Sequence, residues 1–84
     1  MPYYRKKPIP LEASQYTGDN FLDLHEWSNG HVERSIYDDD DDGVLVYSIE
    51  GPMWFNEGDY IIKGAHGEFY PCRKDIFEET YERV

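Results

Sequence analysis

Apolar and polar positions alternate over several short stretches of the chain, and this alternation is typical of β-strands with one buried face. The first stretch runs from Pro8 to Tyr16 and places Ile9, Leu11 and Ala13 on one side. Its two prolines lack N–H donors, so this strand is expected at the edge of a sheet. Further strands are predicted at His31–Tyr37, Val44–Ile49, Met53–Phe55, Tyr60–Lys63 and Glu68–Tyr70.

Helical periodicity is limited to two places. Phe21–Ser28 follows a turn-forming stretch and carries a broad apolar stripe, and Asn29-Gly30 is a strong stop because both residues tolerate the left-handed conformation. Near the end of the chain, Asp75 is expected to cap one helical turn, Ile76–Glu79.

These elements predict an α+β fold, in which five to six short strands form a small, strongly curved antiparallel sheet or partial barrel with one α-helix packed on it. With 84 residues, the chain is expected to be a single domain, residues 1–84. Eight Tyr, four Phe and two Trp supply apolar area for its core. Residues 1–8 are expected to form a basic N-terminal arm, and residues 38–43 an exposed acidic loop.

The charge is strongly negative and unevenly distributed. Eighteen acidic and eight basic residues give a net charge of −10. Arg5, Lys6 and Lys7 lie in the first eight residues, where there is no acid, so from Ile9 onward eighteen acids face five bases, a charge of −13. Such a body repels nucleic acid, because binding to phosphates requires Lys and Arg. The expected partner is therefore a basic surface of a protein or nucleoprotein complex, with no direct contact to nucleic acid.

One low-complexity tract stands out, formed by Asp38, Asp39, Asp40, Asp41 and Asp42. Three interpretations stay open: a solvated loop, a weak site for a divalent cation, and a contact that imitates phosphate. Calcium loops space their acids at alternate positions around a glycine, and this tract lacks that spacing. Five carboxylates over ~17 Å of extended chain match the order of charge density of a DNA strand, with a phosphate every ~3.4 Å.

Other candidate partner-binding residues lie near the tract in the sequence. Glu33, Glu50 and Glu57 would extend an acidic strip if the strands bring them to one face. Tyr37, Tyr47 and Trp54 flank it, and Tyr and Trp are favoured anchors at interfaces. The alternative is that Tyr47 and Trp54 fill the core of a small domain.

Catalytic and metal chemistry has weaker candidates. His25, His31, His66 and Cys72 form no His-x-His or Cys-x-x-Cys pair, so neither a metal nor another cofactor is expected. Cys72 and His66 lie near one hairpin as a possible nucleophile and base, but no third orienting residue is evident. We therefore expect a protein that is not an enzyme.

The single cysteine and the absence of a long apolar run bear on where the chain works. One cysteine excludes an intrachain disulfide, which suits a reducing cytoplasm. No apolar run approaches the ~20 residues needed to span a bilayer, and no signal peptide or membrane contact is expected.

Both ends of the chain carry a recognisable pattern. Gly58–Gly64 reads Gly-Asp-Tyr-Ile-Ile-Lys-Gly, Gly67–Cys72 reads Gly-Glu-Phe-Tyr-Pro-Cys, and Asp75–Glu82 reads Asp-Ile-Phe-Glu-Glu-Thr-Tyr-Glu. With Tyr4–Pro8 and Glu12–Gly18 at the start, the chain resembles a family of small proteins encoded by bacterial viruses and prophages. That family usually has Pro-Gly-Asp where this chain has Glu57-Gly58-Asp59, and the resemblance misses roughly residues 31 to 44. The Gly58-Asp59 turn predicts a hairpin with Gly58 at positive φ.

The resemblance implies a phage origin, a host bacterial cytoplasm and an accessory role against host machinery. The leading hypothesis is thus a non-enzymatic inhibitor of a host nucleic-acid-handling or defence complex, of the anti-CRISPR kind, acting through an acidic, phosphate-mimicking surface. One alternative is a structural, assembly or regulatory accessory of the phage, and another is a small ligand-binding barrel. The target and the oligomeric state stay open.

Overall fold

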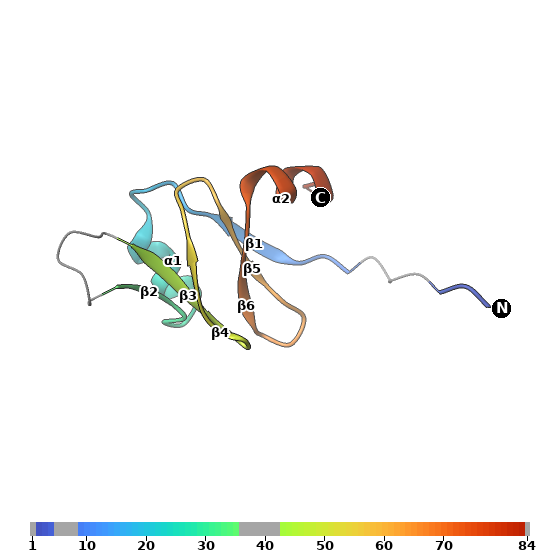
Figure 1. The fold of residues 1–84 in the computed structure, drawn as a ribbon, viewed down its shortest axis with the longest axis horizontal. Helices are drawn as coiled ribbons and strands as arrows, with labels where there is room; N and C mark the ends of the chain where they lie inside the picture. Colours follow the sequence, from blue (N-terminus) through green and yellow to red (C-terminus); the bar gives the residue numbers. More distant parts are fainter. Residues whose placement is uncertain (1, 5–8, 36–42, 84) are drawn as a thin grey trace.

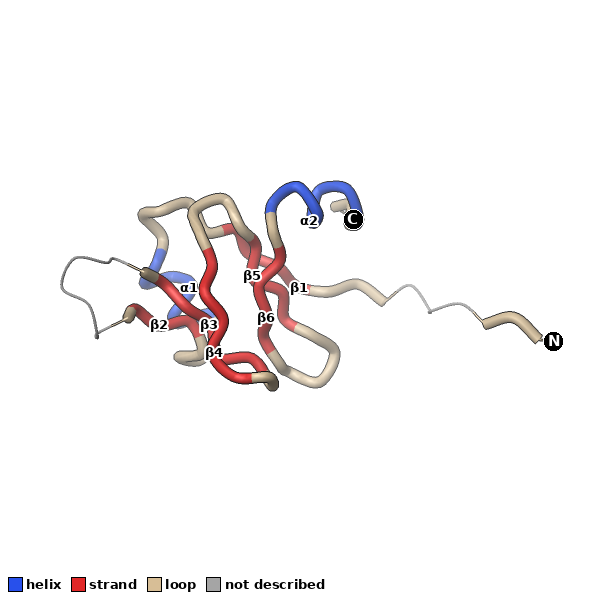
Figure 2. Tube along the Cα trace, viewed as in Figure 1, coloured by secondary structure: helices blue, strands red, loops and turns tan. Residues whose placement is uncertain are grey.

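Two three-stranded antiparallel sheets and two helices make up the described part of the chain, residues 2–4, 9–35 and 43–83 of a computed structural model (Figure 1, Figure 2). Sheet A has the order β1-β5-β6, with β1 at Glu12–Gln15, β5 at Tyr60–Lys63 and β6 at Phe69–Cys72. Sheet B has the order β2-β3-β4, with β2 at Val32–Arg34, β3 at Val44–Ser48 and β4 at Gly51–Phe55. The helices are α1 at Phe21–Trp27 and α2 at Lys74–Thr80.

The α+β class is confirmed, but the single curved sheet or partial barrel is wrong. Over the described residues, the strands form two separate ladders, and there are two helices where one was expected. Strand β6 lies against β3 and β4 without joining their ladder. Two sheets that pack through side chains bury the same apolar residues as one closed sheet, so strand spacing does not distinguish them.

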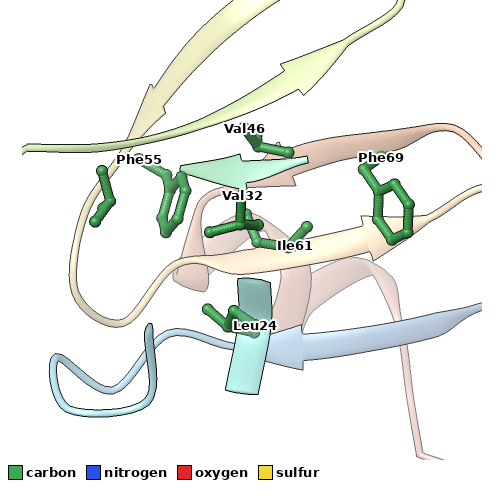
Figure 3. Packing of buried hydrophobic residues seen from close by; sticks show 7 residues of the cluster. Leu24, Val32, Val46, Phe55, Ile61 and Phe69 are labelled. Carbon is green, nitrogen blue, oxygen red and sulfur yellow. The ribbon is translucent and has the colours of Figure 1, made fainter. Parts of the chain in front are cut away.

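The main core lies between the two sheets and α1. Its members are at most 4% exposed, and most are shown in Figure 3: Leu24, Val32, Val44, Val46, Phe55, Ile61 and Phe69. The rings of Trp27 and His31 both contact Phe69, at centroid distances of 5.3 Å and 4.9 Å. Phe69 therefore joins sheet A to the end of α1 and to the start of β2.

Helix α1 protects the free edge of sheet B. Its predicted stop is confirmed, since Asn29 and Gly30 have φ values of 55° and 87°. The buried Ser28 hydroxyl accepts a hydrogen bond from the Val32 N–H at 2.9 Å, and His25 Nδ1 donates to the Val32 carbonyl at 2.8 Å. Side chains from the helix thus satisfy backbone groups on β2 that an edge strand leaves open.

Two predicted strands are longer than the observed ones by two residues or more. Strand β1 begins only at Glu12, and Ile9 before it is exposed, because Pro10 has no N–H to donate to a ladder. Strand β2 ends at Arg34, and the remainder of its predicted range beyond Ser35 lies outside the described residues. The Gly58 prediction is confirmed, with φ at 96° in the turn between β4 and β5.

Helix α2 covers the second face of sheet A. It starts at Lys74, before the expected turn, with Arg73 as N-cap, and Asp75 accepts from the Ile76 N–H within the first turn. Phe77 stacks on Tyr60 at a centroid distance of 3.8 Å and an angle of 11°. Because β5 alternates, Tyr60 and Ile62 share this face, and Ile62 is fully buried. Within the described residues, neither helix is long and apolar enough to cross a membrane.

Candidate protein-binding surface

The register of sheet B places five residues on the side opposite the core. Glu33, Leu45 and Trp54 are aligned across β2, β3 and β4, and Tyr47 is paired with Pro52. Paired residues, and residues two apart on one strand, project from the same face. We call Glu33, Leu45, Tyr47, Pro52 and Trp54 the outer face of sheet B.

The aromatic residues of the outer face are exposed. Trp54 is 60% exposed and Tyr47 47% exposed, so the interpretation that they fill the core is wrong. Val44, Val46 and Phe55 occupy the core face of the same hairpin, and neighbours one residue away must point outward. Ile49, in the turn of the hairpin, and Met53, which is paired with Val46 on the other face of β4, are also exposed. Exposed aromatic side chains on one sheet face make that face a candidate for protein binding.

The three glutamates do not form the continuous strip that was expected. Glu33 lies in the outer face, where its carboxylate is 3.7 Å from His25 Nδ1. Glu50 is in the turn that joins β3 to β4, while Glu57 lies beyond the other end of β4 with its carboxylate against Gly18. The five extended residues of β4 span roughly 17 Å, which separates Glu50 from Glu57. Glu33 and Glu50 thus accompany the hairpin, and Glu57 belongs to another loop.

The predictions for Tyr37 and for Asp38–Asp42 lie outside the described residues. The chain leaves the described region after Ser35 and re-enters it at Gly43, and the Ser35 N–H donates to the Gly43 carbonyl at 2.9 Å. The tract therefore belongs to the connection between β2 and β3 of the sheet that carries the outer face.

Excess negative charge persists without the tract. Leaving out Asp38–Asp42 and Arg5–Lys7 reduces eighteen acidic and eight basic residues to thirteen and five. Among these residues, the ion pairs that involve Lys or Arg are Lys63 with Glu12 at 3.8 Å and Arg73 with Asp75 at 3.0 Å, both largely exposed. The Arg34 guanidinium instead lies 4.5 Å from the centroid of the Phe21 ring. Most carboxylates of the described body are thus uncompensated by neighbouring cations.

Cys72 and His66, the weak candidates for a nucleophile and a base, lie at opposite ends of the β5-β6 hairpin. His66 is in the loop that joins β5 to β6, whereas Cys72 ends β6 opposite Tyr60, three strand residues or roughly 10 Å further on. Burial, aided by the carboxylates of Asp59 and Asp75, raises the pKa of the Cys72 thiol. A thiol that stays protonated at neutral pH is a poor nucleophile.

Small-molecule and metal sites have little support in the described residues. No group of three or more His, Cys, Asp or Glu residues is arranged to hold a metal ion within them. A depression of about 190 Å³ at the start of β1 is lined by Pro10, Leu11, Glu12, Lys63, Gly64 and Ala65. Ligand pockets usually measure ~300–1,000 Å³, so this depression is small for a metabolite.

Comparisons of the chain with models of protein families, with curated proteins and with solved structures found no match. The surface therefore has to be interpreted from its own geometry. Leu45 and Pro52 were missed as members of it, although the sequence held a signal: in Val44–Ile49 both alternating sets of positions contain large apolar residues. A strand that is apolar on both sides needs cover on both sides.

Proposed function

We propose that this protein is a non-enzymatic binding protein, encoded by a phage, that inhibits a host nucleic-acid-handling or defence complex by occupying one of its basic surfaces. The observation that carries the proposal is the outer face of sheet B, where an exposed tryptophan and tyrosine share one face with the half-exposed carboxylate of Glu33. The phage origin rests on the resemblance in Gly58–Gly64, Gly67–Cys72 and Asp75–Glu82.

The proposed mechanism is competition with nucleic acid. Carboxylates of Glu33 and of Asp38–Asp42 would pair with the Arg and Lys side chains that normally hold phosphates in the target. Trp54 and Tyr47 would supply apolar anchoring, because rigid aromatic rings contribute most where they are desolvated at the centre of an interface. The net negative charge would speed the encounter through long-range attraction.

Affinity capture can separate the contributions that charge and apolar contact make to the binding affinity. The full-length protein is used as bait in a host extract, and each retained protein is then purified and titrated with wild type and variants. Affinity should fall steeply as salt rises from about 0.1 M to about 0.4 M, because the Debye length shortens from ~10 Å to ~5 Å. Changing Asp38–Asp42 to Asn should reduce the salt dependence, and Trp54→Ala should weaken binding at every salt concentration.

A matched control for Trp54→Ala is Leu22→Ala, since Leu22 on α1 is 74% exposed and lies away from the outer face of sheet B. Binding that is unchanged at about 0.4 M salt contradicts the electrostatic mechanism. Binding that Leu22→Ala weakens as much as Trp54→Ala contradicts the assignment of the surface.

The structure bears differently on the two alternative functions. A ligand-binding barrel is not supported, because the described strands form two open sheets. An assembly or virion accessory is favoured by one observation, the exposed Tyr3 and Tyr4 near the N-terminus, since extended arms are a common means of joining subunits. Co-purification with phage particles, independent of Trp54, would support the accessory role over the inhibitor.

A further inference from the structure

Tyr3 and Tyr4, in the expected N-terminal arm of residues 1–8, are a second set of exposed apolar groups. Tyr3 and Tyr4 are 97% and 91% exposed, and Ile9, which follows the arm, is also exposed. The molecule measures 55 Å along its longest axis against 23 Å and 21 Å along the others. The N-terminus lies at one end of that axis, and sheet B lies toward the other end (Figure 1).

The chemistry of the arm complements that of the outer face of sheet B. The arm contains Arg5, Lys6 and Lys7, two tyrosines and no acid, whereas the rest of the chain has a charge of −13. The outer face offers the Glu33 carboxylate in line with Leu45 and the exposed Trp54. Basic side chains pair with carboxylates, while tyrosine rings and Lys or Arg pack well against an indole ring.

The route of the chain favours a contact between molecules over a contact within one. Pro10 fixes its own φ and favours an extended backbone at Ile9, so the chain does not turn back at these two residues. Residues 9–11 leave β1 on the side away from sheet B (Figure 2).

We infer that the N-terminal arm of one molecule binds to the outer face of sheet B of a second copy. Arg5, Lys6 or Lys7 pairs with Glu33, and the tyrosines of the arm cover Trp54 and Leu45. Reciprocal exchange of arms gives a closed dimer, and one-way exchange gives a chain of molecules. The inference is independent of any target, although a target that uses the outer face of sheet B would displace the arm.

Sedimentation velocity of the full-length protein tests this inference without a target protein. Between about 1 μM and 1 mM, a range that brackets weak homotypic affinities, the wild type should show a rising sedimentation coefficient at low salt and a smaller rise at about 0.5 M salt. The triple variant Arg5→Ser, Lys6→Ser, Lys7→Ser and the single variant Trp54→Ala should each raise the dissociation constant about tenfold or more.

Matched controls separate the specific contact from a general change of charge or surface. Arg73→Ser, Lys74→Ser, Arg83→Ser removes the same number of positive charges from the other end of the chain, and Leu22→Ala removes a comparably exposed apolar side chain. Both should associate as the wild type does. A wild type that is monomeric throughout, or an arm variant that associates like its control, overturns the inference.

A mixing experiment identifies the two halves of the contact. The arm-neutral triple variant retains an intact outer face, and Trp54→Ala retains an intact arm, so a mixture of the two restores one contact and should associate more strongly than either alone. No gain on mixing contradicts a contact between arm and outer face. The Trp54 fluorescence is the difference between wild type and Trp54→Ala. If it resists acrylamide quenching in the monomer, and the arm-neutral variant removes this protection, the arm folds back on its own body and the inference is overturned.

Discussion

Sheets A and B have the same number of strands, yet they differ in what covers them. Both have large apolar residues on both faces, such as Ile61 and Ile62 in β5 and Leu45 and Val46 in β3. Sheet A packs against sheet B and α1 on one face and contacts α2 through Tyr60 on the other, and Ile61 and Ile62 are both fully buried. Sheet B has cover on one face only, and Trp54 and Tyr47 stay exposed on the other.

This difference makes the outer face of sheet B the candidate for binding a partner. Exposed apolar area lowers the solubility of a protein and adds nothing to the stability of the monomer. An exposed apolar sheet face therefore needs an explanation outside the monomer. An antiparallel sheet with one solvated face usually carries polar residues there. The outer face instead carries aromatic and aliphatic residues beside a carboxylate, which is the composition of an interface.

The largest expected effect on the free energy of unfolding is in the core between the two sheets. Phe69→Ala removes the side chain that contacts Trp27 and His31 at the centre of the core, and should lower the free energy of unfolding by about 3–5 kcal/mol. Urea denaturation monitored by circular dichroism measures this loss. A loss below about 1 kcal/mol, the range of exposed sites, would mean that the two sheets do not share one core.

A smaller effect is expected where α2 covers the second face of sheet A. Phe77→Ala removes the ring that stacks on Tyr60 and Tyr81 and should cost about 1–2 kcal/mol, because the ring is only half-buried. The substitution should also speed amide hydrogen exchange throughout α2. Unchanged exchange in α2 would show that this helix is held by other contacts, and would weaken the comparison of the two sheets.

The covered face of sheet A should also make stability fall at alkaline pH. Burial raises the pKa of Tyr60, Tyr70 and Cys72, with further contributions from Glu78 at Tyr60, from Tyr81 at Tyr70 and from Asp59 at Cys72. All three side chains lie on the face that α2 covers. The folded protein therefore keeps protons that the unfolded chain releases, so the unfolding free energy should fall as the pH rises through 9.0 and then 10.0, the ordinary values for Cys and Tyr.

Cys72→Ser separates the thiol from the phenols in this pH dependence. Serine does not titrate in this range, so the variant should lose less stability than wild type between about pH 8.5 and pH 9.5. Denaturation curves at several pH values measure the slope. A stability that rises with pH in this interval would contradict the assigned direction of the shifts.

The smallest effect on stability is expected on the outer face of sheet B. Trp54→Ala should change the unfolding free energy by no more than about 0.5 kcal/mol, since the side chain is largely exposed and contributes little to the monomer. A thermal melt compared with that of Phe77→Ala measures the contrast. If Trp54→Ala destabilises more than Phe77→Ala, the outer face is part of the folded core.

Turns and helix ends of this fold can be predicted from the local sequence. Which face of each strand is buried cannot be predicted in this way. The stop at Asn29-Gly30 and the positive φ of Gly58 depend on the residues at those positions, and both are confirmed. Whether β6 pairs with β4 or packs against it depends on contacts between residues far apart in the chain. The exposure of Trp54 also depends on distant contacts. Side chains alternate between the two faces of β4, so burying Phe55 exposes Trp54, and the sequence pattern alone would equally allow Trp54 to be buried and Phe55 exposed.

The candidate site was foreseen in part for the same reason. Glu33, Tyr47 and Trp54 were singled out from residue type and proximity in sequence, and the register of sheet B brings them to one face. Glu57 was grouped with them on charge alone, and β4 carries it away. Residue type identifies candidates for an interface, but strand pairing decides which of them act together.

The most direct test of the central claim is the affinity of Trp54→Ala for a protein captured by the wild type, measured by isothermal titration alongside Leu22→Ala. If the outer face of sheet B is the recognition surface, Trp54→Ala binds about tenfold or more weakly at an unchanged melting temperature, as expected for an interface anchor, and Leu22→Ala binds like wild type. Equal affinities for all three proteins would contradict the claim.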